Sequence, residues 1–207
     1  MKHSRSRSGH RCRPGRRALT GWASSAFSLT LLTLLSGCGG GAGAAAVPDG
    51  WDTLDTKSVT VAYPGAAGYQ EQPASERSKH NAAVALKEEG GLRTGMVSVQ
   101  LNFATGVDDA EEAATAAGAV IGLGATRQDT ADVRLNGEES ARQARRIDYE
   151  FTSSGEQRTP EKGTRMTGVM VAGVDSKGVP FLVRINTVKD ALTEDEIDTF
   201  VESITVK

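Results

Sequence analysis

The sequence has few of the side chains on which metal sites, disulfides and most hydrolytic mechanisms depend. It contains three histidines and two cysteines, and aromatic residues make up 5% of its 207 residues. Only His80 follows residue 37 among the histidines, so a histidine-rich metal site is excluded for that part of the chain. Because no G-x-S-x-G motif is present, a surface histidine is favoured over a Ser-His-Asp site. We therefore expect no metal, no cofactor and no enzymatic activity.

The first 37 residues have no acidic residue and seven basic ones. Behind them, residues 23–35 form a short uncharged run, whereas a transmembrane helix needs about 20 mostly apolar residues. A basic segment followed by a short apolar run is typical of a secretory signal peptide. We expect residues 1–37 to be a cleaved signal peptide, with the rest of the chain outside the cytoplasm. Arg16-Arg17 leaves twin-arginine export open beside the Sec route.

The apolar run ends in Leu35-Ser36-Gly37-Cys38, which resembles the lipobox of bacterial lipoproteins. Small residues at 36 and 37 fit a narrow peptidase site, and the Cys38 thiol is a nucleophile for lipid transfer. The resemblance implies that a diacylglyceryl group joins the Cys38 sulfur and that cleavage follows between Gly37 and Cys38. Two or three acyl chains on one cysteine make a lasting anchor, whereas a single chain holds only marginally. We expect a protein held by this lipid on the outer face of the cell membrane.

Removal of the signal peptide changes the charge balance. The whole chain has 24 basic and 26 acidic residues, and the seven basic residues of 1–37 leave with the signal peptide. The mature chain then has 17 basic and 26 acidic residues, a net charge of −9. This balance argues against nucleic acid or an anionic lipid surface as a partner, since both select clustered positive charge. No disulfide is expected, because Cys12 is removed and Cys38 carries lipid.

The remaining sequence divides into a tether and one domain. Residues 38–50 are rich in glycine and alanine with little to bury, which indicates a flexible tether behind the lipid. Residues 51–207 are long enough for one hydrophobic core.

Alternating and helical periods predict three antiparallel hairpins and two helices in that domain. The hairpins are expected over residues 82–103, over residues 133–151 with a turn at Asn136-Gly137, and over residues 169–185. One helix follows Asp108 with a stripe of alanines, and the other follows a capping box that begins at Thr193. These elements predict an α+β fold in which an antiparallel sheet is sandwiched by helices.

The order of these elements resembles the PsbP-like α/β/α sandwich, and within it the LpqN-type lipoproteins of actinobacteria. The resemblance covers residues 51–207 and implies a non-enzymatic, partner-binding domain at the cell envelope. It depends on turn and core positions, namely Tyr63-Pro64, Gly68-Tyr69, the Asn136-Gly137-Glu138-Glu139-Ser140-Ala141 turn and the final Glu202-Ser203-Ile204-Thr205-Val206.

Three groups of residues can be interpreted either as binding sites or as ordinary structural features. The acidic residues 108–112 and 194–198 suggest calcium sites, but the first turns of two helices are favoured because carboxylates stabilise helix N-termini. Gly122-Leu123-Gly124 is better explained as a helix-ending turn than as a phosphate loop. Arg142, Arg145 and Arg146 suit an acidic partner, although a solvated strand face is the favoured interpretation.

The sequence is compatible with three functions, of which the first two are favoured. The first is a binding or scaffolding domain that offers an exposed patch at Trp51, Tyr63 and Tyr69 to an envelope protein. The second is a carrier or sensor of a small apolar ligand, which requires an enclosed apolar pocket. The third, a hydrolase, requires His80 to be buried beside a serine or carboxylate.

Overall fold

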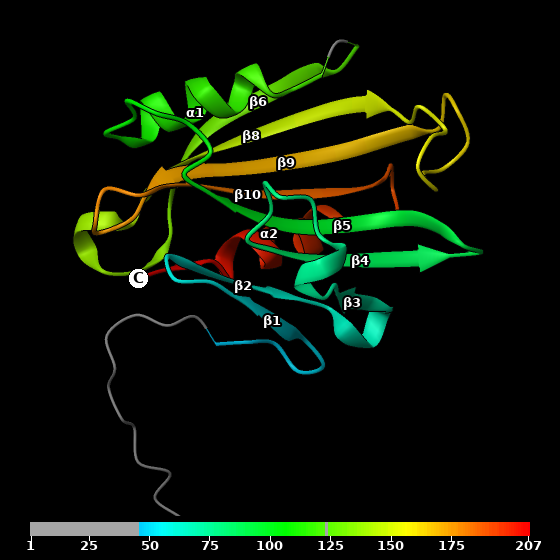
Figure 1. Cartoon of the computed structure of the whole chain (residues 1–207), viewed down its shortest axis with the longest axis horizontal. Helices are drawn as coiled ribbons and strands as arrows, with labels where there is room; N and C mark the ends of the chain where they lie inside the picture. The colour runs from blue at the N-terminus through cyan, green and yellow to red at the C-terminus, as the bar shows by residue number, and fades with distance from the viewer. Residues whose placement is uncertain (1–45, 123) are drawn as a thin grey trace, which may run out of the picture. The chain divides into compact units, whose positions relative to one another are not determined.

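The computed structural model describes residues 46–207 with the exception of Leu123 (Figure 1). The expected signal peptide, the lipobox residues Leu35, Ser36, Gly37 and Cys38, and most of the expected tether lie outside the described residues. Within residues 46–207, leaving Leu123 aside, no helix is long and apolar enough to cross a membrane. The chain forms mostly antiparallel sheets and two α-helices, so the predicted α+β class is confirmed.

A seven-stranded antiparallel sheet forms the centre of the fold, in the order β3-β4-β5-β10-β9-β8-β6. Its strands are β3 (Tyr69–Glu71), β4 (Ala83–Glu89), β5 (Leu92–Leu101), β6 (Thr126–Arg134), β8 (Gln143–Thr152), β9 (Arg165–Val174) and β10 (Pro180–Val188). The predicted hairpins β4-β5 and β9-β10 are confirmed. The second of them turns at Asp175, whose Oδ1 accepts hydrogen bonds from the backbone of Lys177 and Val179.

A smaller sheet has the order β1-β2-β11-β7. Its strands are β1 (Asp52–Asp55), β2 (Val59–Tyr63), β7 (Asn136–Gly137) and β11 (Thr205–Val206). The predicted turn at Asn136-Gly137 is therefore wrong, because these residues pair in parallel with Thr205 and Val206. Gly137 has φ +115, and a Cβ there would lie 1.9 Å from the Val206 carbonyl oxygen. The close approach of another backbone explains this glycine, and β6 and β8 still pair antiparallel around a longer turn.

Both helices begin with a capping residue, at the predicted position in α2 and one residue after the predicted Asp108 in α1. Helix α1 (Ala110–Ala119) starts at Asp109, whose side chain accepts a hydrogen bond from the Glu112 backbone at 2.9 Å. Helix α2 (Glu194–Glu202) has the predicted capping box between Thr193 and Glu196. The acidic residues at both helix starts are thus explained by capping and by the helix dipole.

The two faces of the seven-stranded sheet bury different clusters. Residues such as Val169 and Val171 pack with α2 and the smaller sheet. Their neighbours Met170 and Ala172 point to the opposite face and pack with the alanines of α1. Helix α1 lies over β8 and β9 and reaches β10, while β5 and β4 lie on the other side of β10 (Figure 1). On this face α1 therefore covers one half of the sheet and leaves the other to loops.

Candidate functional site

Of the aromatic residues expected to form a partner surface, Tyr63 and Tyr69 lie in the core and Trp51 packs against it, partly buried. Tyr63 and Tyr69 are 5% and 2% exposed, and Trp51 packs its ring 4.7 Å from that of Phe200. The prediction of an exposed patch at Trp51, Tyr63 and Tyr69 is corrected, because Tyr63 and Tyr69 are buried and Trp51 is partly buried against Phe200 of α2. Their apolar area stabilises the domain rather than a complex.

The residues considered for catalysis or metal binding are also placed elsewhere. His80 is exposed on the loop before β4, and its backbone nitrogen lies 3.5 Å from the Ser78 hydroxyl. It is not buried beside a serine or carboxylate, which the hydrolase hypothesis requires. Among the residues that the structure describes, no group of three or more histidine, cysteine, aspartate or glutamate side chains is arranged to hold a metal ion.

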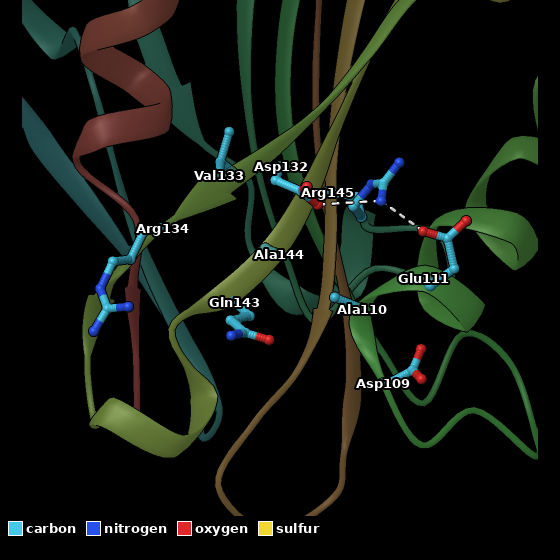
Figure 2. A pocket seen from close by; sticks show the side chains of 9 residues that line it. All are labelled: Asp109, Ala110, Glu111, Asp132, Val133, Arg134, Gln143, Ala144 and Arg145. Atoms are coloured by element: carbon cyan, nitrogen blue, oxygen red, sulfur yellow. Dashed lines mark hydrogen bonds and ion pairs between the residues drawn. The ribbon is translucent and has the colours of Figure 1, made fainter.

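The basic cluster of β8 is engaged by carboxylates of the same chain. Arg145 lies between Glu111 of α1 at 2.6 Å and Asp132 of β6 at 3.1 Å, inside a charged hollow of about 510 Å³ (Figure 2). On the opposite face, Arg146 contacts Asp148 at 2.9 Å and Asp198 at 2.5 Å. Because these cations already have partners, an acidic ligand would have to displace an internal carboxylate.

Arg142 completes the cluster and pairs with Glu139 at 2.7 Å. All three arginines are more than two-thirds buried at the side chain, so the favoured interpretation of a solvated strand face describes them only in part. They tie α1, α2 and the β7–β8 turn to the sheet.

The sheet face that α1 covers only in part is hollowed. Three neighbouring hollows of about 750, 380 and 260 Å³ share lining residues, and we call them together the open-face groove. Residues 78–81 and Val120 line one part, and residues 151–159 line another. The residues shared between hollows are Met96, Val120, Phe151, Thr152, Arg184 and Asn186.

The lining of the open-face groove is basic or neutral throughout. Its charged side chains are Arg93, Arg184 and Lys79, with His80 beside them, and no described aspartate or glutamate lines any of the three hollows. Arg93 has a partner in Glu88 at 3.6 Å. Residues 46–207 have 17 basic and 26 acidic residues, a net charge of −9, so a groove without carboxylates differs in sign from the rest of the domain.

Arg184 is the central cation of the groove and has no partner among the described residues. It lines two of the three hollows and is partly buried. Its Nε is buried and makes no hydrogen bond within the described part of the chain. Except for Arg127, which is exposed, every other arginine of residues 46–207 forms an ion pair. The position therefore combines burial, positive charge and access to a hollow.

Next to Arg184, Asn186 and Tyr149 form a hydrogen bond across the groove floor. The Tyr149 hydroxyl donates to Asn186 Oδ1 at 2.6 Å, which leaves the Asn186 amide nitrogen as a donor. Burial raises the pKa of Tyr149 to about 12, while the Arg184 charge and this hydrogen bond act in the opposite direction. Tyr149 therefore stays neutral near pH 7 and does not compensate the Arg184 charge.

The sequence indicates this site only weakly. Arg184 interrupts an apolar strand, but it lies on the alternate face from Phe181, Val183 and Ile185, where a polar residue is ordinarily solvated. The burial of Arg184 depends on which strands the loops cover in the folded protein. The alternation of residues along one strand does not predict that coverage.

No family model matches the chain, and no curated protein matches it. The resemblance to PsbP-like domains and LpqN-type lipoproteins accordingly stays a prediction, and function is argued from the residues of the groove.

Proposed function

We propose that the protein is a lipoprotein anchored through Cys38 at the outer face of the cell membrane, and that residues 51–207 form a non-enzymatic binding domain at the cell envelope. The open-face groove is its binding surface. The observation that carries this proposal is the central cation Arg184, partly buried in a hollowed sheet face with no internal counter-ion. A partly buried charge without a partner destabilises the free protein, so its presence favours a role in binding.

The anchor and the position of the domain start support presentation outside the membrane. The backbone nitrogen of Trp51 donates to the Pro48 carbonyl at 3.1 Å, and that of Ala66 donates to the Gly50 carbonyl at 3.2 Å. The last residues of the expected tether are thus hydrogen-bonded to the domain, which leaves residues 39–47 as the spacer.

A second candidate function, a carrier or sensor of a small apolar ligand, has a specific observation in its favour. The hollow of about 380 Å³ is lined by Leu86, Met96, Phe151 and Met166. This size falls within the range of small-molecule pockets. The hollow is open to the surface and shares lining residues with its neighbours instead of closing around a ligand, so the binding of part of a larger molecule suits it better.

We further propose that the domain is an α/β/α sandwich of the PsbP-like kind, related to LpqN-type lipoproteins. Its support is the packing of α1 and α2 against opposite faces of the seven-stranded sheet. The smaller sheet shares the α2 layer and adds to that architecture.

Membrane anchoring is tested by fractionation of cells that express the full chain. Replacement Cys38→Ala is expected to abolish labelling by a radioactive acyl-chain precursor and to move the protein from the membrane pellet to the soluble fraction. The matched control is Cys12→Ala, which should leave label and fractionation unchanged. Retained label in the Cys38→Ala protein would exclude the anchor.

Binding by the groove is tested with lipid-free protein that carries Cys38→Ala and with the uncharged fluorescent probe N-phenyl-1-naphthylamine. Met96 lines the two larger hollows, so Met96→Trp should fill both and reduce probe binding at least fivefold. Leu92→Trp changes an exposed position, 38% accessible, outside the groove and should have no effect. Equal binding by all three proteins would contradict the groove as binding surface.

A further inference from the structure

We infer that the open-face groove binds an organic anion, whose single carboxylate, phosphate or sulfonate contacts Arg184 and whose apolar body lies against Met96 and Phe151. This inference rests on the proposed function and names the ligand class for the same groove.

The register of the sheet surrounds Arg184 with neutral side chains. Directly opposite it are Ser98 on β5 and Met170 on β9. Two positions before and after it on the same face of β10 are Leu182 and Asn186. No carboxylate is therefore available from the adjacent positions of either neighbouring strand, and the charge has no partner built into the sheet.

The same chain pairs its other partly buried arginines with carboxylates. Arg146, on the opposite face of the same sheet, contacts both Asp148 and Asp198. Removal of a guanidinium from water is costly unless an anion compensates it. Since Arg184 lines a hollow, the missing anion can come from outside.

The guanidinium group of Arg184 determines which anionic group of the ligand it binds. Carboxylates and phosphates accept two parallel hydrogen bonds from the planar donor fork of arginine, and the bonds are strengthened by the charges. The buried Nε of Arg184 lacks an acceptor, and the Asn186 amide nitrogen is a second donor close by. Lys79 lines the same hollow as Arg184, where its positive charge favours entry of an anion.

The apolar hollow beside Arg184 determines the chemistry of the rest of the ligand. Next to Arg184, the side chains of Met96, Phe151 and Met166 line about 380 Å³ of space together with Leu86. An inorganic anion would leave this apolar surface in contact with water, whereas an aromatic or aliphatic body would bury it. Methionines adapt to ligands of differing shape, so the groove suits a class of compounds.

The test compares two fluorescent probes with the same ring system. 1-Anilinonaphthalene-8-sulfonate carries the anionic head, and N-phenyl-1-naphthylamine lacks it. In lipid-free protein that carries Cys38→Ala, Arg184→Gln is expected to weaken binding of the sulfonate about tenfold to a hundredfold. The same replacement should change binding of the uncharged probe less than threefold. Arg127→Gln, which removes an exposed arginine without an ion pair, is the matched control and should change neither affinity.

Each contrary result has a distinct meaning. If Arg184→Gln weakens both probes equally, or neither, the anion inference is overturned while the binding groove stands. If the unsubstituted groove binds neither probe, the proposed binding function itself fails.

Acetate, which has an anionic group but no apolar body, should not displace the sulfonate at a hundredfold excess. Displacement by acetate would overturn the apolar part of the inference. Circular dichroism of Arg184→Gln checks the fold, and Arg184→Lys, which keeps the charge without the fork, should give an intermediate affinity.

Discussion

Arg184 of β10 lies directly opposite Ser98 of β5 in the antiparallel ladder, so a guanidinium faces a hydroxyl where an ion pair would place a carboxylate. Ser98 is 1% exposed. Side chains in directly opposed positions have their Cβ atoms about 4.5 to 5.5 Å apart, a distance that a short carboxylate and an arginine span easily. A carboxylate at position 98 could thus pair with Arg184 within the sheet, but the chain has a serine there.

The first prediction uses this position. Ser98→Asp should supply the missing carboxylate to Arg184 and compete with any external anion. We expect binding of 1-anilinonaphthalene-8-sulfonate to fall at least tenfold in a fluorescence titration, because the guanidinium is neutralised within the protein. Ser98→Asn, of nearly the same size but uncharged, is the control and should retain binding. Equal loss in both variants would mean that side-chain volume, and not charge, is responsible.

The second prediction concerns stability without ligand. Arg184→Met should leave the unfolding free energy unchanged or raise it by about 1 kcal/mol in urea denaturation, because an uncompensated charge is replaced by an apolar side chain. Arg146→Met should lower it by about 1 to 3 kcal/mol, because two carboxylates lose their partner. A similar loss in both proteins would show that Arg184 has an internal partner in solution.

Local signals were enough to predict most of the elements. The β4-β5 and β9-β10 hairpins follow from alternating apolar residues, and the α2 capping box follows from Thr193 and Glu196. The turn predicted at Asn136-Gly137 is wrong because the same dipeptide that favours a tight hairpin turn also permits a close strand approach. Only the position of Val206, far along the chain, distinguishes the two.

The candidate site was less predictable than the fold. Tyr63 and Tyr69 were expected at the surface, yet α2 places Phe200 against the Tyr69 ring at a centroid distance of 6.1 Å. Arg184 has the sequence pattern of a solvated strand residue. Its significance arises from the half-coverage of one sheet face by α1, which is a tertiary property of the fold.

The third prediction tests the α2 side of the core. Phe200 is fully buried between Trp51 and Tyr69. Phe200→Ala should therefore lower the unfolding free energy by about 3 to 5 kcal/mol, through lost apolar contact and a cavity. Leu92→Ala, at a position 38% exposed, should change it by less than about 0.5 kcal/mol. A loss of under 1 kcal/mol for Phe200→Ala in thermal and urea denaturation would contradict the packing of α2 against these rings.

The last prediction concerns alkaline pH. Burial raises the pKa of Tyr149 from 10.0 to about 12 in the folded protein. A group whose pKa is raised on folding keeps its full contribution below its unfolded pKa and loses it as pH rises through the folded value. The unfolding free energy should accordingly fall between pH 10 and pH 12, with about 2 to 3 kcal/mol of the loss due to Tyr149.

Tyr149→Phe distinguishes this contribution from that of Tyr69, whose pKa is also raised to about 12 by burial. The variant loses the hydrogen bond to Asn186 and should be destabilised at pH 8 by about 1 kcal/mol. Its further decline between pH 10 and pH 12 should be shallower than that of the unsubstituted protein, because one of the three tyrosines with a raised pKa is gone. Parallel declines in urea denaturation at pH 8, 10 and 11.5 would mean that Tyr149 ionises freely in the fold, and the groove floor would then be accessible to hydroxide.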